Sequence, residues 1–446
     1  MCIRDSSRRD DTESAAAFAT EALRQARLRE APGLIADAQL KLAGARWHLG
    51  DHERARTDLS AAIAGYRAIG NPRGEVQARR TLASVLGEPL QADAARDEYQ
   101  RAIALAQSIG DLGEVAAIYR NICADLWTAG DRDGAEAGAR RSLQIAREIG
   151  DLQLQAWTLR ALANIAFDEA ATDEVMNEYR EVTVLTERSH DAGGHVWSLA
   201  TNADALRSRG ELDEAQDNCT RAQRESAALS DPQFAVYSGF NCAVLAFDRG
   251  EIDAARRLLE RVVQLADSSG NAIYSANAQF VLGQIEFDAS RWTIAQGLLR
   301  KVAEKYAKAD GRTGEANAYA LLALCAQALG ETAARDEASA RTRALRAAIT
   351  SKQEIYIVDI ALAQLATGAL ARSQARARLG ELADDAQRRR WISWSLEAKL
   401  AEWRILKADG NAAAASHIRD ELEASARPLG FGRIVALLEE PENVTP

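Results

Sequence analysis

The residues best suited to binding chemistry are arginines and asparagines that recur at a regular interval. Arg80, Arg120 and Arg160 stand forty positions apart, Asn121 follows Arg120, and Asn164 comes one helical turn after Arg160. A guanidinium group binds a carboxylate through two parallel hydrogen bonds, which makes arginine the usual residue for recognising acidic groups. The spacing therefore predicts a row of carboxylate-binding positions on one surface.

Aromatic residues recur at the same interval and would supply apolar anchors beside these arginines. Exposed arginines are often solvated or paired with a nearby acid, and regularly spaced aromatics often only pack one repeat against the next. Both interpretations stay open for each residue. The aromatic residues that we expect in the same groove are Trp127, Trp157, Phe167, Trp197, Tyr237, Phe240 and Phe247.

Motifs of catalysis and metal binding are absent from the sequence. It holds no phosphate-binding glycine loop ending in Lys, no G-x-S-x-G and no H-E-x-x-H. His48 and His52 have helical spacing, but Gly50 breaks the helix between them. His190 and His195 are expected in an exposed loop. We therefore expect no enzymatic activity, no metal and no cofactor.

The five cysteines include no pair with a metal-binding or redox-motif spacing. Cys123, Cys219, Cys242 and Cys325 fall on apolar faces of expected helices, where a small side chain packs well. We expect buried structural thiols and, by default, a reducing cytoplasm.

Composition narrows the class of partner. The chain of 446 residues has a formal net charge of −10. Nucleic-acid binding requires a clustered basic surface, so direct contact with nucleic acid is not expected. No run of 18 apolar residues is present, and we expect no membrane span in this region. A protein or peptide partner with acidic and apolar anchors fits the charge pattern better.

The elements that would position these residues are helices separated by turns at constant spacing. In the unit that begins at Asp111, Gly110 ends the preceding helix, Asp111 caps the next, and Glu114 completes a capping box. A period of forty residues indicates stacked two-helix units that form a solenoid. The first series of turns falls at Gly70, Gly110, Gly150 and Gly270, and the second at Gly50, Gly130, Gly210, Gly250, Gly330 and Gly410.

Small residues recur inside each unit. An alanine five positions after the mid-unit glycine stands at Ala55, Ala95, Ala135, Ala215, Ala255, Ala295, Ala375 and Ala415. Only a small side chain would let two antiparallel helices approach closely there. With a small residue in the first helix and a Gly-Asp turn, this pattern resembles the tetratricopeptide repeat family.

That resemblance implies an all-α, right-handed solenoid of antiparallel helix pairs, with first helices lining a concave groove. In the family, basic and Asn residues on first helices bind the carboxylates or the backbone of a peptide. The matching positions in this sequence are Arg120, Asn121, Arg160 and Asn164. Similar bacterial arrays are commonly attached to signalling or transcription-regulatory domains. The resemblance therefore implies a protein- or peptide-binding scaffold that forms the sensor arm of a larger bacterial protein. The alternative is a receptor for a small peptide or metabolite that closes the superhelix.

The register also suggests boundaries. Residues 1–6 match the translation of a transposase mosaic-end adapter, and we expect them to be a sequencing artefact. Residues 7–30 are expected to be a half repeat, a second helix whose first helix is missing, so that the natural protein is longer. Ten repeats of forty residues follow at 31–430. A solvent-facing capping helix and a polar tail are expected at 431–446.

Overall fold

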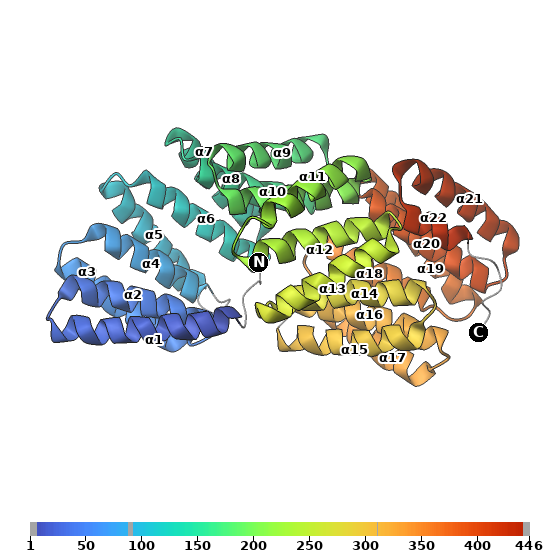
Figure 1. Ribbon diagram of the computed structural model, residues 1–446, viewed down its shortest axis with the longest axis horizontal. Helices are drawn as coiled ribbons and strands as arrows, with labels where there is room; N and C mark the ends of the chain where they lie inside the picture. The colour runs from blue at the N-terminus through green and yellow to red at the C-terminus, as the bar shows by residue number, and fades with distance from the viewer. Residues whose placement is uncertain (1–6, 88–91, 310, 440–446) are drawn as a thin grey trace. The chain divides into compact units, whose positions relative to one another are not determined.

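The computed structural model describes residues 7–87, 92–309 and 311–439, and these form 22 α-helices without a strand. The expected all-α solenoid is confirmed (Figure 1). The expected adapter artefact at residues 1–6 and the whole expected polar tail lie outside the described residues. First helices begin forty residues apart from α2 to α22. They are α2 (Pro32–His48), α4 (Pro72–Leu86), α6 (Leu112–Thr128), α8 (Leu152–Phe167), α10 (Ala192–Arg209), α12 (Pro232–Asp248), α14 (Ala272–Asp288), α16 (Arg312–Ala328), α18 (Lys352–Gln364), α20 (Ile392–Ala408) and α22 (Gly432–Glu439).

Second helices alternate with them along the chain. They are α1 (Ser7–Leu28), α3 (His52–Ala68), α5 (Ala92–Ser108), α7 (Arg132–Glu148), α9 (Asp173–Arg188), α11 (Leu212–Ser226), α13 (Ile252–Ser268), α15 (Trp292–Lys308), α17 (Thr332–Arg346), α19 (Ala369–Arg388) and α21 (Ala412–Leu429).

Capping residues fix where these helices begin. The Asp111 side chain accepts a hydrogen bond from the backbone N–H of Glu114 at 3.2 Å, and Asn71 does the same for Gly74 at 3.1 Å. Gly110 before the first of these caps has a φ of 71°, the left-handed conformation that ends a helix. Where the repeat lacks glycine at such a turn, other residues adopt a positive φ, namely Glu30, His190, Ser290 and Arg390.

The recurring alanines lie where the two helices of a repeat meet. Ala55, Ala135, Ala215, Ala255 and Ala295 are all fully buried. A larger side chain would force the paired helices apart, because protein interiors are close-packed. The forty-residue recurrence of alanine is thus explained by helix packing.

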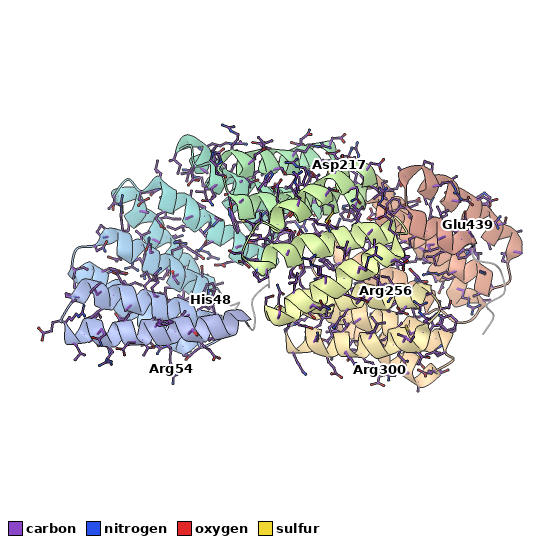
Figure 2. All side chains as sticks on the ribbon, in the orientation of Figure 1. His48, Arg54, Asp217, Arg256, Arg300 and Glu439 are labelled. Atoms are coloured by element: carbon purple, nitrogen blue, oxygen red, sulfur yellow. A yellow bond between two sulfur atoms is a disulfide. The ribbon has the colours of Figure 1, made fainter. Side chains whose placement is uncertain are left out.

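The contacts divide the chain into two compact units. Unit 1 contains Met1–Ile165 with Val184–Asp191, and unit 2 contains Ala166–Thr183 with Ala192–Pro446. In unit 1, α2 contacts α4 and α4 contacts α6, while in unit 2 each first helix from α10 to α20 contacts the next first helix. Figure 2 shows Arg54 and Arg300, both on second helices, extending away from the ribbon. Consecutive first helices therefore lie side by side within each of these stretches.

The last helix differs from the expected solvent-facing cap. Phe431, just before α22, and the α22 residues Ile434 and Leu438 are buried, and α22 contacts α12 as well as α21. The apolar residues on one side of this short helix drive it onto the repeats. Helix α22 is consequently part of the packed body of unit 2.

Candidate functional site: an arginine cluster in unit 1

Three first helices of unit 1 bring Arg80, Arg120, Trp157 and Arg160 together, and we call these four residues the arginine cluster. The Arg160 guanidinium lies 4.4 Å from the centre of the Trp157 ring, and the Arg120 guanidinium lies 5.8 Å from it. Trp157 is 47% exposed, so a large aromatic surface remains open to solvent. The forty-residue spacing thus places α4, α6 and α8 so that equivalent slots adjoin.

Electrostatics single out Arg120 within the cluster. Arg80 pairs with Glu114 at 3.1 Å. Burial lowers the pKa of Arg120, the positive charge of Arg80 lowers it further, and Glu114 opposes the change. A half-buried guanidinium beside a like charge is a position where a ligand carboxylate would be attracted.

A polar network lies next to the cluster, between α4, α5 and α6. Asn121 donates to Ser84 Oγ at 3.3 Å, and the Ser84 hydroxyl is 2.8 Å from that of Tyr99. Tyr99 donates to Asp125 at 2.5 Å. Burial raises the pKa of Asp125 to about 6, although the hydrogen bond from Tyr99 lowers it. These hydrogen bonds hold the Asn121 side chain in place, with its amide group directed toward α4.

Two further expected residues of unit 1 lie on α6 and α8. Trp127 on α6 is partly buried, and the Arg132 guanidinium lies 5.3 Å from the centre of its ring. Asn164 on α8 is exposed. The stacking of Arg132 from the following helix shows that Trp127 serves at least in packing within its repeat.

The aromatic residues of unit 2 pack mainly against one another. Trp197 and Tyr237 stack with ring centres 4.2 Å apart, and Tyr237 and Phe240 each meet Tyr274 edge-on, at 5.8 and 5.6 Å. The Tyr237 hydroxyl lies 2.9 Å from that of Thr201. These contacts join α10, α12 and α14, as the packing interpretation of a regular aromatic series requires.

Phe167 and Phe247 require a correction. We expected them to line a groove, but Phe167 is 8% exposed and Phe247 is 3% exposed. Phe167 meets Tyr179 edge-on at 5.8 Å, and the Arg433 guanidinium covers the Phe247 ring at 4.5 Å. Contacts within unit 2 bury both rings, and no periodicity in the sequence indicates those contacts.

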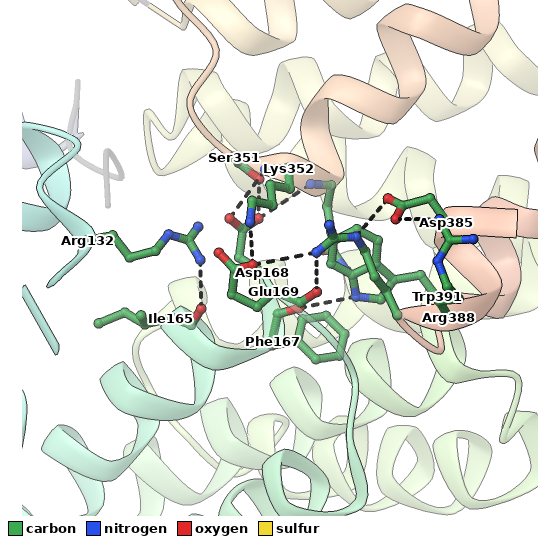
Figure 3. A network of polar contacts seen from close by, with 12 residues as sticks. Arg132, Ile165, Phe167, Asp168, Glu169, Ser351, Lys352, Asp385, Arg388 and Trp391 are labelled. Carbon is green, nitrogen blue, oxygen red and sulfur yellow. Dashed lines mark hydrogen bonds and ion pairs between the residues drawn. The ribbon is translucent and has the colours of Figure 1, made fainter. Parts of the chain in front are cut away.

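A set of long-range polar contacts in unit 2 was missed from the sequence, and we call it the seam. Figure 3 shows its centre, where Asp168 follows α8 and faces the beginning of α18. The Asp168 carboxylate accepts hydrogen bonds from the Ser351 hydroxyl at 2.6 Å and from the backbone N–H groups of Lys352 at 3.3 Å and Gln353 at 3.4 Å. A carboxylate from another repeat thus caps the amino terminus of α18.

The turn before α20 completes this part of the seam. Trp391 is fully buried, and its indole N–H donates to the Phe167 carbonyl at 3.1 Å. Arg389 donates to the Glu169 carbonyl at 2.7 Å, and the Arg389 carbonyl accepts from the Ala171 N–H at 2.8 Å. Side chains and backbone from residues more than 200 positions apart in sequence are therefore fixed together.

A buried charge cluster extends the seam to α14 and α22. Asp288 accepts from Arg433 at 2.7 Å and from Arg404 at 3.0 Å, and Arg433 also pairs with Glu397. Burial acts to raise the pKa of Asp288, but the charges of Arg433 and Arg404 outweigh it and lower the pKa. Each buried charge in this cluster thus has a partner of opposite sign. A buried charge without such a partner would strongly destabilise the fold.

Two predictions about single residues are wrong. His195 is buried in α10 instead of exposed in a loop, with Nδ1 3.2 Å from the Thr183 carbonyl and Nε2 3.5 Å from the Glu225 carboxylate. Cys219 and Cys242 form a disulfide across a Cα–Cα distance of 5.4 Å, where separate thiols were expected. Facing positions on α11 and α12 are brought together only by the fold.

The expectations for Cys123, Cys325, His48 and His52 agree with the structure. Cys123 and Cys325 are buried free thiols, and burial raises the pKa of each, to about 11 and about 12. His48 ends α2 and His52 begins α3, so a turn separates them.

Across the described part of the chain, no three His, Cys, Asp or Glu side chains are grouped to hold a metal ion. None of the described helices has the length and apolarity needed to cross a membrane.

Comparison with solved structures places this geometry in a known fold. A Rap protein complexed with Competence and Sporulation Factor superimposes with a TM-score of 0.57 at 13% identity, covering 80% of this chain and 99% of Rap. The chain has the tetratricopeptide-repeat fold. The apo form of the quorum sensor NprR from B. thuringiensis matches with a TM-score of 0.50 at 12% identity, covering 75% of this chain and 98% of NprR.

A third tetratricopeptide-type structure, the human IFIT1 dimer with PPP-AAAA, covers 95% of this chain and 96% of its own at 15% identity. Its TM-score of 0.45 does not establish a shared arrangement of repeats, so the IFIT1 ligand says nothing about this chain. No protein-family model and no curated protein matches the sequence.

Proposed function

We propose that the chain is a non-catalytic scaffold that binds a protein or peptide through the arginine cluster of unit 1. The observation that carries this proposal is Arg120, whose half-buried charge lies beside Arg80 and 5.8 Å from the centre of the half-exposed Trp157 ring. A partner carboxylate would offset the repulsion between the two guanidinium groups. A neighbouring apolar side chain of the partner would cover the exposed Trp157 ring.

The wider role that we propose is the sensor arm of a bacterial signalling or transcription-regulatory protein. Its support is the fold shared with NprR, which is described as a quorum sensor, and with Rap, which was solved with a named factor. Direct nucleic-acid binding is not part of this proposal, because the chain carries a net charge of −10.

The test uses a synthetic peptide array in which acidic residues are combined with aromatic or aliphatic ones. Binders are then measured by calorimetry against the wild-type chain and the double variant Arg120→Glu with Arg160→Glu. We expect the wild type to bind acidic, apolar peptides with an affinity that falls as salt is added, and the variant to lose at least about tenfold in affinity.

A matched control comes from α7. The double variant Arg140→Glu with Arg141→Glu makes the same total charge change at two exposed residues of α7. Arg140 pairs with Glu136 on its own helix. This variant should bind like the wild type. Equal affinity for the wild type and the Arg120/Arg160 double variant, with helical content unchanged, would reject the site.

The second candidate is a receptor for a small signalling peptide or metabolite that closes the superhelix. The likeness to Rap solved with Competence and Sporulation Factor favours it. Small-angle scattering separates the two. A compact ligand that shortens the molecule supports the receptor, whereas a bound folded partner without compaction supports the scaffold.

A further inference from the structure

Two neighbouring second helices of unit 2 carry positive charge, although the chain as a whole is acidic. Helix α15 has four basic residues and one acidic residue, Glu304, and α17 has four basic residues and two acidic ones. By contrast, α9 has two basic residues and five acidic ones, and α11 has two and four. Helix α16 contacts both α15 and α17, so the two basic helices flank the same first helix. The positive charge is therefore concentrated at one part of unit 2.

Three charges of α15 lack an acidic partner. Arg300, Lys301 and Lys308 are exposed, and none of them forms an ion pair with a described residue. Lys305 differs, because it is partly buried and pairs with Asp267 at 3.4 Å. Figure 2 shows the Arg300 side chain extending away from the ribbon. Charges that no nearby acid compensates attract an anionic partner.

An apolar side chain lies on the same face of α15 as two of these charges. Ile294 is 54% exposed, and Lys301 and Lys308 follow it at intervals of seven residues, which is two helical turns. A Cβ on Gly297, between Ile294 and Lys301, would meet no atom within 4 Å. No neighbouring side chain therefore covers this part of the helix, and a partner would meet an apolar group beside cations.

We propose that this face of α15 docks onto an anionic phospholipid bilayer. Seven of the 55 basic residues of the chain are lysines, and three of these seven lie on α15. The lysine ammonium is a point charge on a flexible stem, so it can follow headgroups that move laterally, whereas the rigid arginine fork suits a fixed carboxylate. Basic helix faces are attracted to anionic leaflets, and Ile294 would enter the interface between headgroups and acyl chains.

The net charge of −10 does not prevent this docking. Salt screens exposed charges that are more than about 8 Å apart at physiological ionic strength, so acidic residues on distant helices add little repulsion at α15. The attraction of each lysine to the bilayer falls off over the same length. The docking should consequently be reversible and sensitive to salt. It does not depend on the arginine cluster, which belongs to unit 1.

The experiment measures cosedimentation of the full chain with lipid vesicles. Vesicles of phosphatidylcholine alone are compared with vesicles that hold equal parts of phosphatidylcholine and phosphatidylglycerol. We expect the wild type to bind the mixed vesicles only, and added salt to release it. The double variant Lys301→Glu with Lys308→Glu should lower the partition coefficient by at least about tenfold.

Two further variants separate the α15 face from the total charge. Arg140→Glu with Arg141→Glu makes the same total charge change at exposed residues of α7 and should bind like the wild type. Lys301→Arg with Lys308→Arg keeps the charge and should also bind like the wild type, because mobile headgroups require no fixed geometry. All four side chains are exposed, so every variant should keep the wild-type circular dichroism spectrum.

Three results would overturn the proposal. The first is a wild-type chain that does not bind the mixed vesicles at low salt. The second is equal weakening by the charge reversals on α15 and on α7. The third is binding of polyglutamate, but not of mixed vesicles, that is lost in the α15 charge reversal, because the face would then accept an acidic polypeptide.

Discussion

Single residues that break the forty-residue pattern carry much of the information about this chain. Asp125 is the clearest case, because its carboxyl group occupies a slot that is apolar elsewhere. Burial in such a slot favours the protonated carboxyl group, whereas the hydrogen bond from Tyr99 favours the charged carboxylate. The counterparts of Asp125 in other repeats are Ala45, Val85, Ile165, Ala205, Leu245 and Ile285, all buried.

Asp125 should therefore make unit 1 sensitive to pH. Its pKa of about 6 in the folded chain exceeds the unfolded value of about 3.9. The folded state binds more protons between these values, so the contribution to stability is full below about pH 4 and is lost as the pH rises through about 6. Relative to Asp125→Asn, the wild type should lose about 1–2 kcal/mol of unfolding free energy over this range.

Urea unfolding of the wild type and of Asp125→Asn at a series of pH values measures this difference. The asparagine keeps an acceptor for the Tyr99 hydroxyl, so the variant isolates the titrating proton. Stability curves that run parallel across the whole series would contradict the assignment.

At the scale of the helix, alanine sets how closely the two members of a pair approach. Ala255 on α13 is fully buried, and the nearby Val262 of the same helix comes within 3.0 Å of the position that a Cβ on Gly239 of α12 would occupy. There is no space between these helices for larger side chains. Helices α12 and α13 can therefore pack together only because both carry small residues where they meet.

Replacing Ala255 by Trp should destabilise unit 2. The indole would have to displace α12 or adopt a strained rotamer, which costs about 1–3 kcal/mol or more. Ala413→Trp provides the control, because Ala413 is exposed on α21. Thermal unfolding should show a lower midpoint for Ala255→Trp and almost none of this change for Ala413→Trp. Similar midpoints for both variants would mean that α12 and α13 can separate without cost.

Across the whole molecule, unit 2 is tied together by repeats that are distant in sequence. The seam joins the ends of first helices to the beginnings of α18, α20 and α22, and α10 contacts α20 directly. At Gly250 the backbones approach closely. A Cβ there would lie 2.8 Å from the carbonyl carbon of Gly432 and 2.9 Å from the backbone nitrogen of Arg433.

Gly250→Ala should therefore weaken the attachment of α22. Gly330→Ala is a close control, since Gly250 and Gly330 have φ values of 77° and 74° but a Cβ on Gly330 meets no atom within 4 Å. The strain of a left-handed alanine is common to both variants, and only Gly250→Ala adds a backbone clash of about 1–3 kcal/mol. Hydrogen exchange should show faster exchange in α22 for Gly250→Ala alone. Equal exchange in the two variants would show that the clash is relieved elsewhere.

The sequence alone determined the helices, their caps and their order. Gly and Asp at constant spacing act locally, because a left-handed residue ends one helix and a side-chain oxygen starts the next. The adjacency of Arg80, Arg120 and Arg160 was also predictable, since equivalent slots of neighbouring repeats lie next to each other. These conclusions needed no contact beyond the adjacent repeat.

Only the tertiary structure decided what lies between repeats that are far apart in the chain. The burial of Phe167 and Phe247, the cap that Asp168 gives to α18, and the Cys219–Cys242 disulfide all depend on where helices come to rest. The position of each helix is the sum of the small rotations between successive repeats before it. The local pattern does not encode the sum, so the seam of unit 2 became visible only in three dimensions.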